Sequence, residues 1–295
     1  MTLQNPATAN PVCQSTPART WAGVGFKPQH FQDIMENAGC VRFLEVHAEN
    51  YMGAGGMPHR QLTLLRERFD LSVHGVGLSI GGLALDDIHL DRLHKLVRRY
   101  QPRWVSEHLA WSTHDGVFFN DLLPLAYDNA ALTRVVSHLG RVQDRLGRQI
   151  LLENPSTYVA FESSTWDEVD FIREVTHRAG CDLLLDINNV QVSCVNHSRD
   201  PLVYLNAFPL ERVREIHLGG YATDDVPGEP LLIDAHDRPV QPDVWRLYAH
   251  ALKIGGPVST LIEWDNDVPD AHTLFEEAAK ADALLADVIN ERSAA

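Results

Sequence analysis

The chain has 295 residues, of which 44% are hydrophobic, enough for a large core and too many for a disordered protein. Its formal net charge of −15, from 40 acidic and 25 basic residues, argues against a protein that binds nucleic acid through a broad positive face. No apolar run approaches the ~18 residues of a membrane span, and the four cysteines form no Cys-x-x-Cys pair, so we expect a cytoplasmic protein with reduced thiols.

The first 19 residues are polar and rich in Pro, Ala and Thr, which predicts a flexible arm before a single domain over residues 20–295. Beyond the arm, short apolar runs of strand length alternate with segments whose apolar residues keep helical spacing. The predicted strands are 21–25, 41–47, 71–74, 104–108, 150–153, 183–186, 213–217 and 260–263. Helices are predicted between them, including a long one over 132–146, and a last helix is predicted over 274–289.

Repeated strand–helix units predict a parallel sheet whose strands are buried on both faces. Eight units in a chain of this length favour a closed (β/α)8 barrel of the TIM type, which takes about 250 residues, over an open sheet. In such a barrel the C-terminal ends of the strands meet at the face that holds the active site. Side chains at these strand ends are therefore expected to be neighbours in space.

Six candidate ligands, each a histidine or a carboxylate, stand at the ends of predicted strands: His74, His108, Glu153, Asp186, His217 and Glu263. One such histidine alone would more often be a packed core residue, but three at equivalent strand ends favour ligands. The carboxylates follow leucine or isoleucine, and a buried carboxylate costs several kcal/mol unless a cation neutralises it. Since no lysine or arginine stands beside them in these strands, a bound metal is the simplest partner.

A segment after the seventh strand adds further candidates. If residues 231–237 are extended, Asp234 and His236 point to one face, although an exposed loop is the competing interpretation. Asn189, three residues after Asp186, is either a turn residue or an amide ligand. These candidates exceed the about four to six ligands of one ion, so two or three metals bridged by carboxylates are implied. Imidazole and carboxylate suit zinc, manganese or iron alike.

Three further polar residues are candidates for the pocket. His197 is either a surface histidine or a group that contacts substrate or transfers a proton. Glu49 and Asn50 follow the second strand and are expected to have a polar role in the pocket. Other histidines fall in predicted helices or loops and are expected to be solvated, among them His30, His59, His94, His138, His177, His250 and His272.

Several motifs stand near the predicted strand ends. They are Phe43-Leu-Glu-Val-His-Ala-Glu-Asn-Tyr51, Val73-His-Gly-Val-Gly-Leu-Ser79, Ser106-Glu-His-Leu-Ala-Trp111, Leu152-Glu-Asn-Pro155, Leu185-Asp-Ile-Asn-Asn-Val190, Asn196-His197, His217-Leu-Gly-Gly-Tyr221 and Asp234-Ala-His236. In combination they resemble the multinuclear non-haem iron-dependent oxidative enzymes, over about residues 20–285. The resemblance implies a TIM barrel related to xylose isomerase that holds two or three irons in mixed ferrous and ferric states.

By matching positions, the resemblance assigns a central pair of irons to His74, His108, Glu153, Asp186, His217 and Glu263. It makes Glu153 and Glu263 bridges, and it assigns a third site to Asn189, Asp234 and His236. Related nucleases tend to have a histidine at the position of Asn189, which argues against a three-zinc nuclease. We further predict catalytic roles for Glu49 and His197, and substrate contacts for Asn50, Tyr51, Trp111, Asn154 and Tyr221.

The activity that the resemblance implies is the oxidation of cysteines in a ribosomally made precursor peptide, with iron as cofactor and dioxygen as co-substrate. The products would be a thiooxazole or an oxazolone–thioamide pair. Many relatives need a partner protein that holds the leader of the precursor, so the expected partners are the peptide and such a protein, without nucleic acid or membrane. Copper handling is a common role in the family.

Other functions remain open on the same ligands: a divalent-metal phosphodiesterase similar to endonuclease IV, a sugar isomerase or epimerase, and a metal-binding protein that is not an enzyme. A nuclease predicts a basic mouth, yet the loops 53–59, 75–82 and 219–232 carry almost no lysine or arginine. An isomerase would usually want a catalytic lysine or histidine near the metals.

Overall fold

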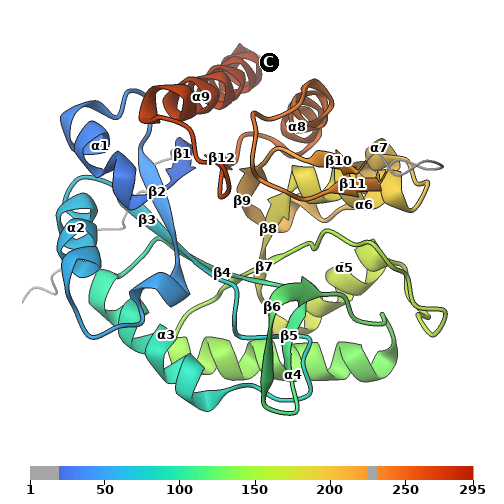
Figure 1. Cartoon of the computed structure of the whole chain (residues 1–295). Helices are drawn as coiled ribbons and strands as arrows, with labels where there is room; N and C mark the ends of the chain where they lie inside the picture. Colours follow the sequence, from blue (N-terminus) through green and yellow to red (C-terminus); the bar gives the residue numbers. More distant parts are fainter. Residues whose placement is uncertain (1–19, 225–230, 295) are drawn as a thin grey trace, which may run out of the picture.

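The structure, a computed structural model, describes residues 20–224 and 231–294, so the predicted arm 1–19 lies outside the described residues. Eight parallel strands close into one barrel in the order β1-β12-β9-β8-β7-β4-β3-β2 (Figure 1). The strands are β1 Ala22–Gly25, β2 Phe43–His47, β3 Asp70–Gly75, β4 Trp104–His108, β7 Leu151–Glu153, β8 Asp182–Asp186, β9 Val213–Leu218 and β12 Ser259–Ile262. The predicted TIM barrel and its eight strands are confirmed, with ends that differ by at most two residues.

Helices surround the barrel (Figure 1). They are α1 Phe31–Asn37, α2 Met57–Arg66, α3 Asp87–Tyr100, α4 Asn129–Leu146, α5 Glu168–Ala179, α6 Ile187–Asn196, α7 Pro201–Ala207, α8 Pro242–Gly255 and α9 Ala271–Ala294, with 3-10 turns η1 Pro28–His30, η2 Ala48–Tyr51 and η3 Leu210–Arg212. The aspartates Asp86, Asp128 and Asp167 accept backbone N–H bonds at the starts of α3, α4 and α5, which satisfies donors that a helix leaves free. None of the helices in the described part of the chain is long and apolar enough to cross a membrane.

The barrel interior is apolar at its floor. One side chain from each of five strands packs there, in a floor cluster of Phe43, Trp104, Leu151, Leu184 and Leu261. Side chains two apart in a strand point the same way, so the next interior layer holds the residues two positions later, Glu45, Ser106, Glu153, Asp186 and Glu263. Burying the floor cluster thus aims a polar layer at the C-terminal mouth of the barrel.

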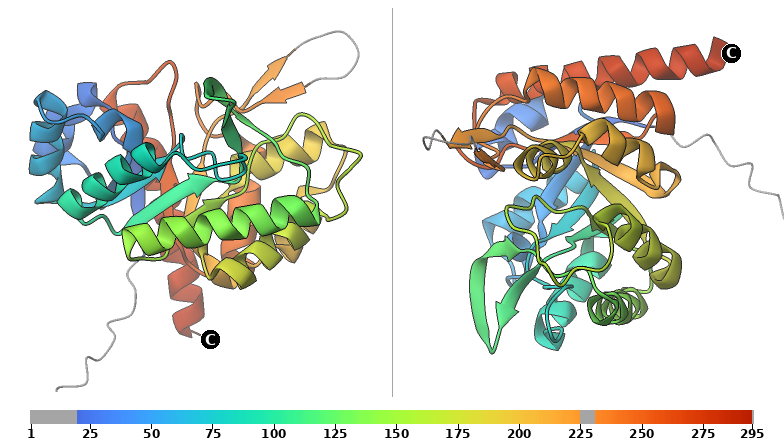
Figure 2. Two further views of the ribbon diagram at one scale, coloured as in Figure 1. Left: turned by 90° about the horizontal axis from the view of Figure 1, so that it is seen from below. Right: turned by 90° about the vertical axis from the view of Figure 1, so that its right-hand side faces the viewer.

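Two antiparallel hairpins that the sequence analysis did not predict stand beside the mouth. One pairs β5 Trp111–His114 with β6 Val117–Leu123, and the other pairs β10 Ala222–Asp224 with β11 Leu231–Ile233. Both lie on the same side of the barrel, away from the C-terminal end of α9 (Figure 2). The predicted extended segment 231–237 is a strand only as far as Ile233.

Candidate metal centre

Two histidines converge on one carboxylate oxygen in the polar layer. The Nε2 atoms of His74 and His108 lie 3.3 and 3.1 Å from Oε2 of Glu153. Their Nδ1 atoms are held elsewhere, that of His74 by Ser106 Oγ at 2.7 Å and that of His108 by the Gly75 carbonyl oxygen at 3.0 Å. A metal-binding histidine is held in this way, with one nitrogen fixed by a neighbour and the other free to bind.

A second group of donors adjoins the first. His217 Nδ1 lies 3.0 Å from Glu263 Oε2, and donor atoms of Asp186, His217 and Glu263 all lie within 4.8 Å of one another. The same distance limit joins His217 to His74 and Glu153. His217 therefore belongs to both groups, and all of these side chains are buried.

Asp234, His236 and Asn189 flank these groups. His236 Nε2 lies 2.8 Å from Asp234 Oδ1, and its Nδ1 lies 3.6 Å from Glu263 Oε1. Asn189 stands in the first turn of α6, which Asp186 caps by accepting the Asn189 N–H at 2.6 Å. His236 reaches this position from a loop with a φ of +47°, so its orientation does not come from strand alternation.

Glu153 Oε2 and His236 Nε2 have only the ion-pair contacts described above, without hydrogen-bond geometry. Asp186 Oδ2 and Asn189 Oδ1, both buried, have no hydrogen-bond partner among the described residues. Such atoms are rare in folded proteins and need an explanation. Burial raises the pKa of Glu153 to about 7 and that of Asp186 well above its ordinary value, so ionising these groups without a cation is costly. Bound metal would satisfy these lone pairs and offset the burial of the negative charge, and the donor set therefore fits metal.

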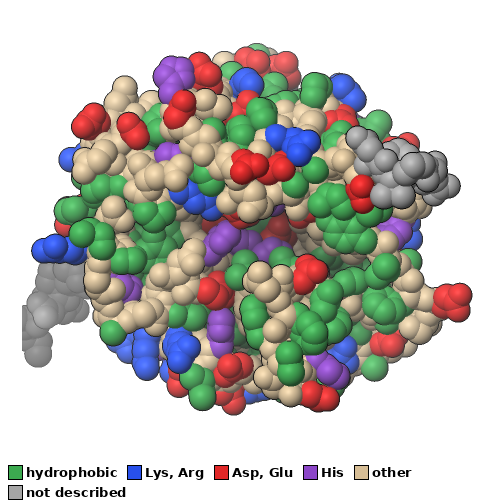
Figure 3. Space-filling view, in the orientation of Figure 1, with side chains coloured by type: hydrophobic (Ala, Val, Ile, Leu, Met, Phe, Trp, Pro, Cys, Tyr) green, Lys and Arg blue, Asp and Glu red, His purple; other side chains and the backbone are tan. Residues whose placement is uncertain are grey.

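A cavity of about 140 Å³ opens above these donors. Seven predicted ligands line it: His74, His108, Glu153, Asn189, Asp234, His236 and Glu263. It leads into an outer hollow of about 390 Å³ that shares Leu122, Ser156 and Asp234 with it and adds Phe118 and Tyr158. Histidine and acidic side chains gather in the hollow at the centre of this face (Figure 3). The mouth thus lies between the β5–β6 hairpin and the loop after β7.

Two residues that the sequence analysis missed as ligands stand at the rim. His47 Nε2 lies 3.4 Å from Asp265 Oδ2, and donor atoms of His47, Glu263 and Asp265 fall within 4.8 Å of one another. Lys27 binds the other Asp265 oxygen at 2.5 Å. His47 ends β2 as His108 ends β4. The search for histidine or carboxylate at strand ends, here called the strand-end rule, could therefore have found it.

Two buried carboxylates below the centre were missed as well. Glu45 Oε2 lies 3.2 Å from His217 Nε2, and Glu215 accepts a hydrogen bond from Ser72 Oγ at 2.9 Å. Burial, with the neighbouring Glu45 carboxylate, raises the pKa of Glu215 to about 8. Glu45 and Glu215 stand two residues before His47 and His217 on their strands, and this spacing was the available signal.

The residues predicted after the second strand lie outside the metal cavity. Glu49 Oε1 accepts hydrogen bonds from Val76 N–H at 3.2 Å and from His89 Nε2 at 3.1 Å. Asn50 is exposed, and Tyr51 is buried with its ring centroid 6.1 Å from that of His59. None of the three predicted residues lines the cavity, so they do not adjoin the predicted metals directly.

Three predicted substrate contacts have partners within the protein. Trp111 Nε1 donates to the Pro124 carbonyl at 2.7 Å. Tyr221 OH donates to Asp243 at 2.7 Å, and Asn154 is bonded to the backbone of Asp186. Their roles toward substrate remain predictions.

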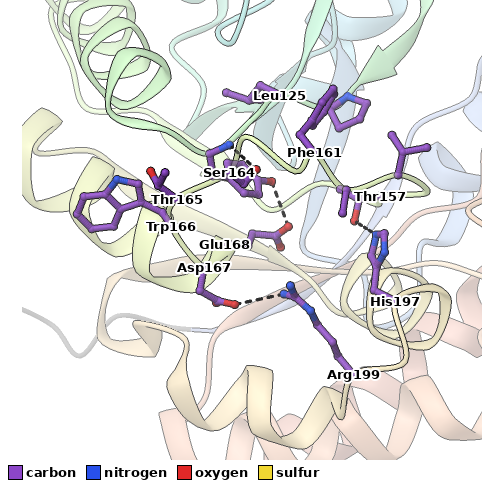
Figure 4. Close-up of a pocket in the computed structure, with 14 residues that line it drawn as sticks. Leu125, Thr157, Phe161, Ser164, Thr165, Trp166, Asp167, Glu168, His197 and Arg199 are labelled. Carbon is purple, nitrogen blue, oxygen red and sulfur yellow. Dashed lines mark hydrogen bonds and ion pairs between the residues drawn. The ribbon is translucent and has the colours of Figure 1, made fainter.

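His197 lines a second cavity of about 530 Å³ (Figure 4). Its Nε2 lies 3.0 Å from Thr157 Oγ1, and Arg199 pairs with Asp167 in the same wall. Pro155 and Ser156 line the metal cavity, whereas the next residue, Thr157, lines this one. One loop therefore separates His197 from the metal centre.

Three histidines that were expected to be solvated are buried instead, since each finds a partner in the core. His30 Nε2 contacts the Pro269 carbonyl at 2.8 Å, and His138 Nδ1 contacts the Ile80 carbonyl at 2.9 Å. His59 lies between Tyr100 OH at 2.6 Å and the Gly53 carbonyl at 2.9 Å. Helix or loop position alone did not predict exposure.

Solved structures share this fold at low sequence identity. A xylose isomerase-like TIM barrel protein from Mycobacterium smegmatis in complex with magnesium is 14% identical, covers 91% of this chain and 98% of its own, and superposes with a TM-score of 0.61. The 3-keto-D-glucoside 4-epimerase YcjR from E. coli is 12% identical, with coverage of 89% and 99% and a TM-score of 0.60. These likenesses show the TIM-barrel fold.

Closer relatives are found by sequence. A UPF0276 protein of Bordetella parapertussis is 52% identical over 283 residues, which cover 95% of this chain and 97% of the relative. A UPF0276 protein of Caulobacter vibrioides is 46% identical over 266 residues, with coverage of 90% and 95%. The profile of a family described as "RiPP precursor modification enzyme MbnB/TglH/ChrH" matches residues 21–286, where RiPP stands for ribosomally synthesised and post-translationally modified peptide. The chain belongs to this family of peptide-modifying enzymes.

Proposed function

We propose that the chain oxidises cysteine residues of a ribosomal precursor peptide at a centre of two or three irons, with dioxygen as co-substrate. One observation carries the proposal. Histidine, carboxylate and amide side chains, some with buried atoms that have no hydrogen-bond partner among the described residues, converge at the face where such barrels keep their active sites. The chain that builds this site belongs to a family of peptide-modifying enzymes. Imidazole and carboxylate ligands suit non-haem iron. Bound iron would supply the redox chemistry that the side chains of the protein lack.

Nine side chains would hold the irons. The central pair would be held by His74, His108, Glu153, Asp186, His217 and Glu263. The third ion would be held by Asn189, Asp234 and His236. Glu153 adjoins both His74 and His108, and Glu263 adjoins both His217 and His236, which supports bridging roles for these two carboxylates.

The outer hollow gives a peptide a route to the proposed metal ligands. Phe118 and Tyr158 flank its mouth, and Val76, Leu122 and Pro155 contribute apolar wall to the inner cavity. Apolar walls exclude water and strengthen the electrostatic interactions of a thiolate that enters. Catalytic roles for Glu49 and His197 stay predictions, and either role would require a water or a substrate group between the side chain and the cavity.

The mouth gives no support to a phosphodiesterase. Within the described part of the chain, no lysine or arginine lines either the metal cavity or the outer hollow. A phosphodiesterase would be expected to place positive side chains there for a phosphate backbone. The likeness to an epimerase concerns the fold alone at 12% identity.

The proposal includes a partner protein that holds the leader of the precursor peptide. β6 exposes Val117, Phe118 and Phe119 beside the mouth, and apolar side chains gathered on a surface commonly mark contact with a peptide or protein. Copper handling stays an expectation from the family resemblance.

The test is metal analysis of protein purified without chelator, followed by mass spectrometry of small cysteine-containing peptides encoded beside its gene. We expect at least two irons per chain, a coupled mixed-valent signal in anaerobic spectroscopy, and a mass change that needs dioxygen and disappears when the peptide cysteine is replaced by serine. Zinc alone at full occupancy together with phosphodiesterase activity would contradict the proposal.

A further inference from the structure

One buried contact on the inner side of the metal centre joins a proposed metal ligand to a carboxylate that is not itself a proposed ligand. Glu45 on β2 and His217 on β9 are 2% and 0% exposed, and Glu45 Oε2 lies 3.2 Å from His217 Nε2. β1 and β12 stand between these two strands in the barrel. The contact therefore crosses the barrel interior, and neighbouring-strand pairing does not explain it.

The two ring nitrogens of His217 face different carboxylates. Nδ1 lies 3.0 Å from Glu263 Oε2, whereas Nε2 faces Glu45. A neutral imidazole has one N–H and one lone pair. With the proton on Nε2, the ring donates to Glu45 and its Nδ1 lone pair faces the metal centre. With the proton on Nδ1, the ring would donate to Glu263 and its Nε2 lone pair would face the Glu45 oxygen at 3.2 Å. Either neutral tautomer thus turns one lone pair toward a carboxylate oxygen. The first tautomer agrees with the proposed ligand set, because Glu263 is a proposed metal ligand whereas Glu45 is not.

His217 is held differently from the other two histidines of the central group. His74 and His108 donate from Nδ1 to neutral oxygens and present Nε2, although Glu107 Oε1 lies 3.7 Å from His108 Nδ1. His217 is fixed at Nε2 by a carboxylate and presents Nδ1. An ionised acceptor makes the stronger hydrogen bond and raises the basicity of the opposite nitrogen.

We propose that Glu45 is a positioning residue: it accepts a hydrogen bond from Nε2–H of His217 and thereby presents Nδ1 of that ring as the metal ligand. The inference rests on the proposed metal centre, which supplies the metal. It does not depend on the peptide, on dioxygen or on the identity of the metal.

Glu215 provides a matched control. It is fully buried and stands two residues before His217 on the same strand. One of its carboxylate oxygens lies within 4.8 Å of the possible metal-binding atoms of Glu45 and His217. Its hydrogen-bond donor, however, is Ser72. Glu215→Gln therefore removes an equally buried carboxylate without removing the proposed partner of the ring.

The test uses zinc, which is diamagnetic and takes the same ligand types. We would record ¹⁵N shifts of the histidine rings in zinc-loaded protein and assign His217 by loss of its signals in His217→Gln. The wild type should show a protonated Nε2 and a zinc-bound Nδ1. Glu45→Gln replaces the carboxylate acceptor of Nε2–H by a weaker, neutral amide oxygen and should bind zinc about 10- to 100-fold more weakly, the loss typical when the group that hydrogen-bonds a metal-bound histidine is changed. Glu215→Gln should stay close to the wild-type affinity and keep the ring signals.

Two results would overturn the inference while leaving the proposed function in place. One is a zinc-bound Nε2 of His217 in the wild type, a measurement that needs no variant to fold. The other is an equal loss of zinc affinity in Glu45→Gln and Glu215→Gln, which would show a general effect of buried charge. A wild-type chain that binds no metal would instead remove the metal centre and, with it, the proposed function.

Discussion

Asn154 and Asp186 exchange a reciprocal pair of hydrogen bonds. The Asn154 side-chain amide donates to the Asp186 carbonyl and its oxygen accepts the Asp186 N–H, each at 2.9 Å. Asn154 follows β7, and Asp186 ends the neighbouring strand β8. The Asn154 side chain therefore extends the pairing of these two strands beyond the last residues that pair through their backbones. This fixes the backbone from which Asp186 directs its unpartnered Oδ2.

Replacing Asn154 by aspartate tests this relationship. A carboxylate can accept from the Asp186 N–H but cannot donate to its carbonyl, so we expect metal affinity to fall by about 10- to 100-fold and the free energy of unfolding of metal-free protein to fall by about 1–3 kcal/mol. Asn129→Asp is the control, since Asn129 only accepts, from Trp166 Nε1 at 2.9 Å. Metal titration and urea unfolding are the measurements, and unchanged affinity in Asn154→Asp would contradict the expectation.

A second prediction concerns the close approach of Gly219 to His236. A Cβ atom added at Gly219 would lie 2.5 Å from Cδ2 and 2.6 Å from Nε2 of the His236 ring. Gly219→Ala should therefore displace the ring and lose about one metal ion per chain while the central pair remains. Gly140→Ala on α4 meets no atom within 4 Å and should keep all metal, with helix stability raised by up to about 1 kcal/mol. Metal counts per chain decide between these outcomes.

The strand-end rule explains how much of this centre the sequence could predict. His108, Glu153 and Asp186 end strands, His74 stands one residue before the end of its strand, and Glu263 follows a strand directly. Their convergence therefore required only a closed parallel barrel. The apolar floor cluster enforces that result, because packing leucine or an aromatic side chain inward also turns the residue two positions later inward.

The other contacts of the centre join residues that no regular spacing in the sequence relates. Asp265 reaches His47 through a loop, and Glu45 meets His217 across the barrel, so both needed the closed structure to be seen. The β5–β6 hairpin exposes Val117, Phe118 and Phe119. Strand prediction from buried apolar runs does not recognise strands whose apolar side chains face outward. Side chains on loops, such as His236 with its positive φ, take their direction from local turns.

A third prediction is a pH dependence that comes from Glu168, away from the metals. This carboxylate accepts hydrogen bonds from Tyr127 OH at 3.0 Å and Tyr204 OH at 2.7 Å, yet burial raises its pKa above the ordinary 4.5. In the unfolded chain it ionises at the lower pH. Its contribution to stability is therefore fully present below about pH 4.5 and is lost as the pH rises through the folded pKa.

Glu168→Gln removes this ionisation. The free energy of unfolding of the wild type minus that of the variant should fall steadily as the pH rises from 4.5, on top of a constant offset of about 1 kcal/mol for the altered hydrogen bonds. Chelator-treated protein should be used, so that pH-dependent metal binding does not contribute, and the titration of the free ligands then cancels between the wild type and the variant. The exposed Glu162→Gln controls for net charge, and a difference independent of pH in Glu168→Gln would refute the assignment.

A fourth prediction concerns the protein's own thiols. Burial raises the pKa of Cys181 to about 12 and that of Cys194 to about 12, and the thiolate is the reactive form. Cys40 is only half-buried. In a Cys13→Ser variant, which removes the cysteine outside the described residues, a disulfide reagent should label Cys40 first and the other two only on unfolding. Fast labelling of all three in native protein would contradict this.

The last prediction separates the central ions from the peripheral one. Glu153 Oε2 adjoins two histidines of the central group, so a bridging role means that its loss disturbs both central ions. His236 and Asp234 come from a loop and line the open cavity, and Asn189 is neutral, so the ion that they hold should be bound less tightly. Glu153→Gln should accordingly lose most bound iron and all oxidation of the peptide, whereas His236→Ala should lose about one ion and keep the central pair. Metal counts per chain, with dioxygen-dependent mass change of the peptide, measure both effects. Equal loss of all metal in the two variants would show that this division of the ligands is wrong.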